Sequence, residues 1–244
     1  INWKEREKEL IELLDKHRRN DGHWDVIVPS SGGKDSGYVA HQLKYKYNMN
    51  PLTVTWSPLE YTDIGRQNLQ SHINSGLSNL LYTPNGKLQR KLVKLCFEEL
   101  GDAFHVFVLG QLSFPFHIAQ KLGVNLVFYG ENGEAEYGGD PEYYDKPLKP
   151  ATEWVNQYLK GTTFSDLFNY GIDNKKYMNA DDISKSDLVY YSPPSITDLD
   201  KAGIKGKYFF SYYKKWIPQE NYYYCVENTG FKPNKERVEG TYSK

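Results

Sequence analysis

The sequence has few cysteines and no long apolar run, and each absence excludes a class of protein. Its 244 residues include two cysteines, Cys96 and Cys225, which form neither a disulfide framework nor a C-x-x-C metal pair. We therefore expect a reducing, cytoplasmic setting. No apolar stretch approaches the ~18 residues that cross a bilayer, so we expect neither a membrane partner nor a signal peptide. A net charge of -1, from 30 basic and 31 acidic residues, argues against nucleic acid as the main partner.

Two common nucleotide-binding motifs are also missing. Neither the G-x-x-x-x-G-K-[ST] spacing of a Walker A loop nor the dinucleotide motif G-x-G-x-x-G occurs. A different glycine-containing turn is present. The apolar run 26–28 leads into Ser31-Gly-Gly-Lys-Asp-Ser36, and the stretch 38–47 that follows can be helical. This order predicts a strand, a tight turn and a helix.

The turn contains the groups of an anion site. Gly32 and Gly33 let the backbone turn sharply and approach a ligand closely. The hydroxyls of Ser31 and Ser36 and the free N–H groups of the new helix would face the turn, and Lys34 adds a positive charge. A Gly-Gly turn that binds nothing is the structural alternative, but the full string after an apolar run favours a phosphate site.

Apolar runs alternate with amphipathic stretches along the chain, which predicts an α/β fold with a doubly wound, mainly parallel sheet. We expect strands at 26–28, 52–56, 79–83, 125–129 and 207–213, and helices at 3–19, 62–73, 87–100, 115–122 and 219–227. Segment 104–109 fits either a strand or a buried helix. We expect residues 1–139 to form an ATP-binding core. Residues 140–244 should form an irregular insertion or lid, together with the last strand and helix of the same domain, and this part should lie on the substrate side.

An acidic, glycine-rich loop, 130–139, follows the predicted strand 125–129. Its carboxylates, Glu131, Glu134 and Glu136, would bind Mg²⁺ together with phosphate oxygens, or grip sugar hydroxyls, or form a solvated acidic turn. Trp56 ends the second predicted strand, where it either stacks on adenine or belongs to the core.

The string Ser31–Ser36 resembles the Ser-Gly-Gly-x-Asp-Ser signature of the PP-loop ATP pyrophosphatases. The resemblance implies an adenine nucleotide alpha hydrolase-like fold. It also implies that this loop holds the pyrophosphate of ATP while the α-phosphorus is attacked, which gives an adenylylated intermediate.

Several further motifs together resemble the N-acetyl sugar amidotransferase family, whose members make acetamidino sugars for lipopolysaccharide O-antigens and flagellin. These motifs are Thr55-Trp-Ser-Pro58, Thr83-Pro-Asn-Gly-Lys87, Tyr129-Gly-Glu-Asn-Gly-Glu134, Glu136-Tyr-Gly-Gly139, Asn221-Tyr-Tyr-Tyr-Cys-Val-Glu-Asn-Thr-Gly-Phe231 and Glu239-Gly-Thr-Tyr242. The resemblance implies that ATP adenylylates the amide oxygen of an N-acetyl sugar. Ammonia then replaces that oxygen, and AMP and pyrophosphate are released.

The resemblance also implies a role for individual residues. ATP would be bound by Ser31, Gly32, Gly33, Lys34, Asp35, Ser36, Trp56 and Gly110. Catalysis would use Lys34, Asp35, Glu131 and Glu134, and Mg²⁺ would be held by Asp35 and Glu131. The sugar would be bound by Glu136, Asn228, Thr229 and Arg237. A solvated arginine is the alternative for Arg237.

Nothing in the sequence resembles a glutaminase, so the family resemblance implies partners. These are a nucleotide-activated N-acetyl sugar as substrate, and ammonia supplied by a separate glutaminase subunit through a cyclase-like barrel subunit. Family members typically begin with a cysteine-rich, zinc-binding segment, which we do not find. Because the chain begins at Ile1, we expect a piece of a longer protein and no zinc in this piece. The alternatives are another PP-loop adenylylating enzyme, for RNA thiolation or amide synthesis, and a non-catalytic ATP-binding module.

Overall fold

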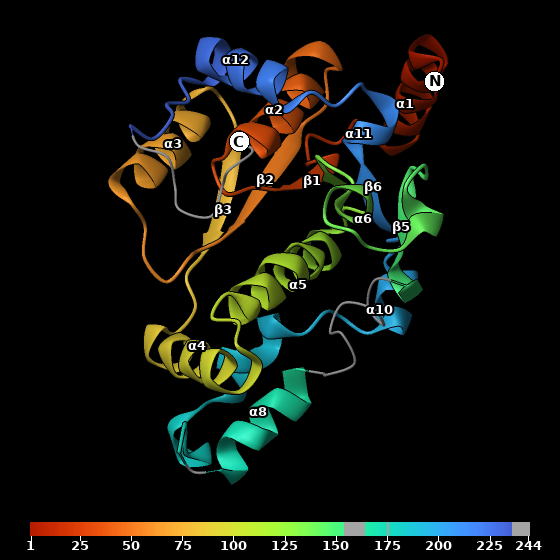
Figure 1. Cartoon of the computed structure of the whole chain (residues 1–244). Helices are drawn as coiled ribbons and strands as arrows, with labels where there is room; N and C mark the ends of the chain where they lie inside the picture. Colours follow the sequence, from red (N-terminus) through yellow and green to blue (C-terminus); the bar gives the residue numbers. More distant parts are fainter. Residues whose placement is uncertain (154–163, 175, 236–244) are drawn as a thin grey trace.

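A computed structural model describes residues 1–153, 164–174 and 176–235 (Figure 1). Its centre is a six-stranded sheet in the order β3-β2-β1-β4-β6-β5. The strands are β1 (Val26–Pro29), β2 (Pro51–Trp56), β3 (Ser78–Tyr82), β4 (Val127–Tyr129), β5 (Leu148–Pro150) and β6 (Gly206–Phe209). Five strands are parallel, and β5 pairs antiparallel to β6 at the edge. The predicted α/β class with a mainly parallel sheet is confirmed.

Helices cover both faces of this sheet or pack beyond its carboxyl edge (Figure 1). They are α1 (Trp3–His17), α2 (Lys34–His41), α3 (Asp63–Asn74), α4 (Gly86–Leu100), α5 (His105–Leu122), α6 (Gly133–Glu136), α8 (Phe164–Asp173), α9 (Lys185–Leu188), α10 (Ile196–Lys201), α11 (Phe210–Tyr213) and α12 (Pro218–Thr229). Helix α2 continues into a π-helical turn, η1 (Gln42–Lys46), and three short 3-10 turns are η2 (Pro141–Tyr143), η3 (Ala180–Asp182) and η4 (Val189–Tyr191).

The central strand β1 is buried on both sides. Val26 and Val28 pack with Leu10 of α1 and Val39 of α2 on one face, whereas Ile27 faces the cluster formed with α4 and α5 on the other. A strand covered on both faces must be apolar at every position, which explains the continuous run that the sequence shows there.

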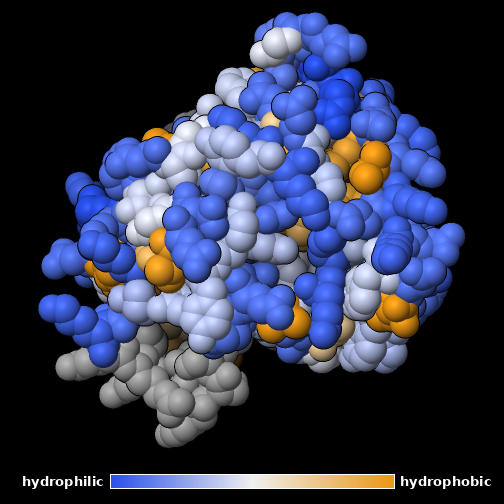
Figure 2. All heavy atoms as spheres, turned by 90° about the horizontal axis from the view of Figure 1, so that it is seen from above, coloured by the Kyte–Doolittle hydropathy of each residue, from blue (hydrophilic) through white to orange (hydrophobic). Residues whose placement is uncertain are grey.

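The surface above α12 and α2 is mostly hydrophilic, with small separate apolar patches (Figure 2).

The order of the strands reverses at β1, whose two neighbours are β2 on one side and β4 on the other. Chain connections therefore leave the carboxyl ends of β1 and β4 in opposite directions and open a crevice between them. In open α/β sheets ligands bind at this point.

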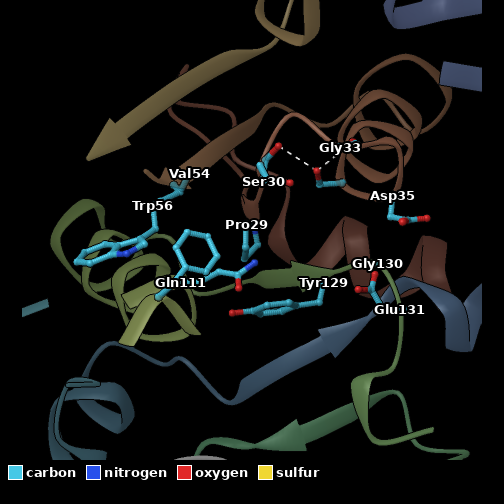
Figure 3. A pocket seen from close by; sticks show the side chains of 13 residues that line it. Pro29, Ser30, Gly33, Asp35, Val54, Trp56, Gln111, Tyr129, Gly130 and Glu131 are labelled. Atoms are coloured by element: carbon cyan, nitrogen blue, oxygen red, sulfur yellow. Dashed lines mark hydrogen bonds between the residues drawn. The ribbon is translucent and has the colours of Figure 1, made fainter. Parts of the chain in front are cut away.

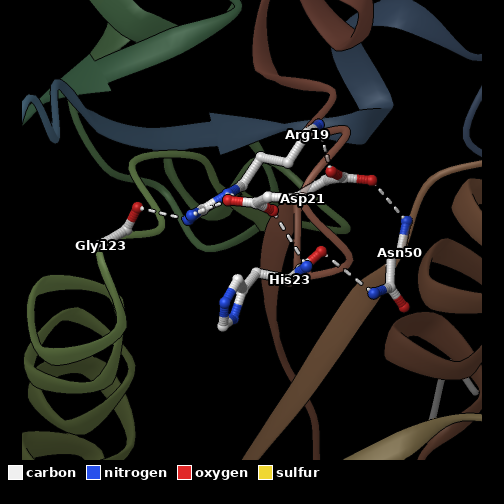
Figure 4. A network of polar contacts seen from close by, with 6 residues as sticks. Arg19, Asp21, His23, Asn50 and Gly123 are labelled. Atoms are coloured by element: carbon white, nitrogen blue, oxygen red, sulfur yellow. Dashed lines mark hydrogen bonds and ion pairs between the residues drawn. The ribbon is translucent and has the colours of Figure 1, made fainter.

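Polar contacts close the opposite, amino-terminal edge of the sheet (Figure 4). The carboxylate of Asp25 accepts the backbone N–H groups of Arg19, at 2.6 Å, and of Asn50, at 2.7 Å. The Arg19 guanidinium pairs with Asp21 at 2.5 Å and donates to the carbonyl of Gly123 at 3.2 Å. This edge is therefore occupied by structural contacts, which leaves the carboxyl edge for a site.

One open assignment is decided and two expectations about single elements are corrected. Of the two alternatives for segment 104–109 the helical one holds, because α5 runs from His105 through Pro115 to Leu122 as one helix. The last strand ends at Phe209, and Phe210–Tyr213 forms α11 instead of continuing it. The region expected to be irregular contributes β5 to the sheet. Within the described ranges, no helix is both long and apolar enough to span a bilayer.

Candidate functional site

A pocket lies at the reversal point of the strand order, at the carboxyl ends of β1, β2 and β4 (Figure 3). It contains about 710 Å³ of empty space, part of which is open to solvent. Its walls are formed by Pro29, Ser30, Ser31, Gly33, Asp35, Ser36, Val54, Trp56, Phe107, Gln111, Tyr129, Gly130 and Glu131. Thus the glycine-containing turn and the start of the acidic loop, about 100 residues apart in the sequence, share one pocket.

The turn after β1 is organised by serine hydroxyls. The Ser30 hydroxyl accepts the N–H of Gly32 at 3.2 Å and lies 3.0 Å from the Ser36 hydroxyl, which donates to the carbonyl of Gly33 at 3.3 Å. Gly33 is the N-cap of α2 and has no side chain to cap it. The first N–H groups of α2 therefore remain available for an anion that enters the pocket.

The two glycines of the turn are required to different degrees. Gly32 has φ +81°, and a Cβ added to it would lie 2.7 Å from the Cα of Leu69 in α3. No other residue fits there, because both the backbone angle and the contact with α3 exclude a side chain. Gly33 has φ -75°, and its added Cβ would meet the Ser31 hydroxyl at 3.2 Å. Gly32 therefore brings the turn against α3, and Gly33 borders the pocket.

Lys34 and Asp35 form an ion pair, with 2.5 Å between the ammonium and one carboxylate oxygen. Asp35 lines the pocket, whereas Lys34 is not part of the wall. The other oxygen of Asp35 accepts a hydrogen bond from the Asn221 amide at 3.3 Å, and the Cys225 thiol donates to the carbonyl of Lys34 at 3.0 Å. Both of these donors belong to α12, so the C-terminal helix holds the start of α2 in place.

Glu131 faces the same pocket as Asp35. Burial, and then the negative charge of Asp35, raise the pKa of Glu131, while a 3.4 Å hydrogen bond from the Tyr137 hydroxyl acts in the opposite direction. A carboxylate whose ionisation is disfavoured by a second carboxylate in the same pocket would be stabilised in its charged form by a cation. Among the described residues no group of three or more metal-binding side chains is present. A pair of carboxylates suits Mg²⁺, which keeps waters and takes phosphate oxygens as further ligands.

The other two glutamates of the acidic loop do not reach the pocket. Glu134 pairs with Lys149 at 2.7 Å and accepts the N–H of Asp140 at 2.9 Å. Burial raises the pKa of Glu134, but these two hydrogen bonds outweigh it and the net shift is downward. Glu136 is exposed to solvent. This geometry does not support the catalytic role expected for Glu134, because its carboxylate pairs with Lys149 and does not line the pocket.

Trp56 and Gly110 belong to the core beside the pocket. The Trp56 side chain is 4% exposed and stacks on Tyr82, with 5.2 Å between the ring centroids. A Cβ on Gly110, in the middle of α5, would lie 2.0 Å from the indole ring. Trp56 borders the pocket, but this packing leaves neither face of its ring open for adenine, and Gly110 is not part of the wall.

Of the residues expected to bind the sugar, those that the structure describes do not line the pocket. The Asn228 amide donates to the carbonyl of Tyr224 and the Thr229 hydroxyl to that of Cys225, both at 2.8 Å within α12. Neither residue lines the pocket, because these side chains satisfy their own helix. Arg237 lies outside the described residues.

Other residues of the site were not identified from the sequence. Gln111 and Phe107, on one face of α5, and Tyr129 form much of the wall. His72 of α3 is 2% exposed, and its Nε2 atom lies 3.5 Å from the Ser30 hydroxyl. Burial lowers the pKa of His72 to about 4, so the ring is neutral near pH 7. The apolar pattern of α5 and the polar pattern of α3 contain no local signal for these positions.

Comparisons with known proteins add little. No family model matches the chain, and no curated protein matches it. Among solved structures, the chain is similar to NMN synthetase from Francisella tularensis, with 12% sequence identity and a TM-score of 0.35 over 83% of this chain and 93% of that one. A likeness of this size supports no inference about the site.

Proposed function

We propose that this protein is an ATP-dependent enzyme of the PP-loop type, which transfers the adenylyl group of ATP to an oxygen atom and releases pyrophosphate. One observation supports this most strongly. The serine- and glycine-containing turn at the start of α2 and the carboxylates of Asp35 and Glu131 face one pocket. Donors for phosphate on one wall and a cation site beside them are what a nucleotide triphosphate requires.

The residues of the pocket would act mainly by position and charge. The Ser31 and Ser36 hydroxyls and the first N–H groups of α2 would hold the leaving pyrophosphate. Lys34 would leave its pair with Asp35 and turn toward the phosphates. Asp35 and Glu131 would hold Mg²⁺, which neutralises phosphate charge when it is bound with the nucleotide.

For the second substrate we propose an N-acetyl sugar, on the basis of the motif resemblance. The amide oxygen attacks the α-phosphorus of ATP and the bond to pyrophosphate breaks. Ammonia then adds to the activated carbon, the bond from that carbon to the adenylyl oxygen breaks, and AMP leaves with the former amide oxygen. One proton is released to solvent and the product is an amidine. Activation is needed because an amide is a weak electrophile and its oxygen a poor leaving group.

An assay with ATP, Mg²⁺, ammonium and a set of nucleotide-activated N-acetyl sugars tests this function. We expect AMP and pyrophosphate in equal amounts, together with a sugar whose mass reflects replacement of one oxygen by NH. Ser36→Ala and Glu131→Gln should lower the rate, and Glu12→Gln, at an exposed position on α1, should not. Formation of ADP without any change in the sugar would contradict the proposal.

The thiolation alternative is disfavoured by the cysteines. Burial raises the pKa of Cys96 to about 11 and that of Cys225 to about 12, and both side chains are fully buried. Attack on a substrate requires an exposed thiolate. An amide synthetase would give AMP and pyrophosphate with a carboxylate substrate, and an ATP-binding module would give no pyrophosphate with any substrate.

The glutaminase and barrel subunits stay proposals that follow from the motif resemblance. If ammonia comes from a partner, the isolated protein should use ammonium but not glutamine. Addition of the partner should then restore activity with glutamine. Activity of the isolated protein with glutamine would contradict this part of the proposal.

A further inference from the structure

A second pocket lies at the start of α4, away from the nucleotide pocket. It contains about 1000 Å³ of empty space, part of it open to solvent, and is lined by Asn85, Lys87, Leu88, Arg90, Lys91 and Ile183. Three of these six side chains are cationic. The pocket therefore combines a hollow surface with concentrated positive charge.

The positive charge is placed where a helix by itself disfavours it. The amino-terminal end of a helix carries partial positive charge, which favours acidic side chains, but α4 has none in its first turn. Among the described residues, neither Lys87 nor Arg90 has a carboxylate within ion-pair distance. Asp187 of α9 lies four residues after the lining residue Ile183, and its carboxylate already accepts hydrogen bonds from the N–H and hydroxyl of Ser184. An anion in the pocket would add the negative charge that Lys87 and Arg90 lack as an ion-pair partner.

The side chains, and not the helix end, offer the donors. The Asn85 side chain caps α4 by accepting the N–H groups of Lys87, at 3.1 Å, and Leu88, at 3.3 Å. The ammonium of Lys87 and the fork of Arg90 are exposed at the pocket. A guanidinium binds phosphate through two parallel hydrogen bonds, and an ammonium adds a point charge. Phosphate or diphosphate is therefore the anion that these two side chains would recognise.

The second pocket lies at the same edge of the sheet as the first. Helix α4 follows the carboxyl end of β3, and Tyr82, the last residue of β3, stacks on Trp56 at 5.2 Å. Trp56 in turn lines the nucleotide pocket. The stacked pair therefore connects the wall of the nucleotide pocket with the strand that leads into α4, and both pockets lie at the carboxyl edge of the sheet.

We propose that Lys87 and Arg90 bind the phosphate groups of the second substrate, a phosphorylated small molecule such as a nucleoside diphosphate sugar. The anion site itself rests on the pocket and its charges, and its assignment to the second substrate rests on the proposed function. This also assigns a role to the motif Thr83-Pro-Asn-Gly-Lys87, in which Asn85 starts the helix that carries both side chains.

Calorimetric titration tests the site. The nucleotide pocket is first saturated with Mg²⁺ and α,β-methylene-ATP, and the protein is then titrated separately with UDP-N-acetylglucosamine, UDP, inorganic pyrophosphate and N-acetylglucosamine. We expect the three phosphate compounds to bind and the free sugar to bind more weakly. Lys87→Gln with Arg90→Gln should weaken phosphate binding by about tenfold or more, since each removes a charge-assisted hydrogen bond. The affinity for the ATP analogue should not change.

Lys94→Gln is the matched control, because Lys94 lies on the same helix and only approaches Glu98, at 3.8 Å. The proposal is overturned if the double variant binds the phosphate compounds as the parent does, if Lys94→Gln weakens them equally, or if none of them binds. Binding of an RNA oligonucleotide through Lys87 and Arg90, without binding of UDP-N-acetylglucosamine, would also overturn it.

The two proposals can fail separately. If the analogue does not bind, the proposed function fails, and the same titrations on the protein alone still decide on the anion site. Loss of phosphate binding in the double variant would then support the site without the function. Formation of AMP and pyrophosphate at an unchanged Michaelis constant for the sugar in the double variant would support the function without the site.

Discussion

The Asn221 amide donates a hydrogen bond of 3.3 Å to the carboxylate of Asp35, across 186 residues of sequence. Asn221 is 2% exposed and lies on α12, whereas Asp35 lies in the first turn of α2. One carboxylate oxygen of Asp35 is thereby held by the last helix while the other is paired with Lys34. Helix α12 therefore supports the candidate site although none of its residues lines the pocket.

We expect Asn221→Asp to weaken ATP binding by about tenfold, because it replaces a donor to Asp35 by a second negative charge in a buried position. Titration with a non-hydrolysable ATP analogue measures the effect. Asn228→Asp, on the exposed side of the same helix, is the control and should bind as the parent does. Equal loss in both variants would show that the helix, and not this hydrogen bond, matters.

Gly32→Ala should destabilise the protein by about 2 kcal/mol, because alanine would have to adopt a left-handed backbone angle and its Cβ would overlap α3. Chemical denaturation measures the free energy of unfolding. Gly33→Ala is the matched variant, since its backbone angle suits any residue and its added Cβ meets only the Ser31 hydroxyl. The idea fails if Gly33→Ala is the more destabilising of the two.

Gly110→Ala should also destabilise the protein, by about 1–3 kcal/mol, because the added methyl group overlaps the Trp56 ring. In an open helix the same change would stabilise, since alanine is the better helix former. The second variant, Trp56→Phe, removes the larger ring system. In the double variant we expect less destabilisation than the sum of the two single changes, as measured by a double-mutant cycle of unfolding free energies. Simple additivity would contradict the contact.

Glu134→Gln should cost about 3 kcal/mol of stability, because it removes a carboxylate that lies 2.7 Å from the nearly buried Lys149 ammonium. Its side chain is not in the nucleotide pocket, so the folded fraction should keep its affinity for ATP. Thermal unfolding and analogue titration together measure both effects. Loss of ATP affinity without loss of stability would return Glu134 to the catalytic role expected from the sequence.

Glu131→Gln should have the opposite effect on stability near neutral pH. Burial and the neighbouring Asp35 raise the pKa of Glu131, so folding favours its protonated form. The stability that this group contributes is present at low pH and is lost as the pH rises through the raised pKa. We expect Glu131→Gln to unfold at a higher temperature than the parent at about pH 7, with the difference shrinking toward about pH 4.5.

The same variant should respond less to Mg²⁺ with nucleotide, because a bound cation favours the ionised carboxylate that glutamine lacks. Unfolding scans at several pH values, with and without Mg²⁺ and the ATP analogue, measure both effects. Glu136→Gln is the control at an exposed position. A constant difference between Glu131→Gln and the parent at all pH values would contradict the raised pKa.

Much of the fold could be predicted because its signals are local. The apolar run becomes β1, and the predicted helices 62–73 and 87–100 correspond to α3 (Asp63–Asn74) and α4 (Gly86–Leu100). Helix α5 was divided in the prediction because Gly110 and Pro115 usually interrupt helices. In the structure Gly110 instead contacts the Trp56 ring, and no local sequence pattern predicts this contact.

By itself, the sequence determined the strand, turn and helix around Ser31–Ser36, since glycine angles and helix starts depend on neighbouring residues. It also indicated that Glu131 follows a buried strand. Only the tertiary structure decided that Glu131 lines the same pocket as Asp35, whereas Glu134 forms an ion pair with Lys149. The reason is physical: which buried charges become paired depends on distant segments that packing brings together, and neighbours in one loop can receive opposite roles.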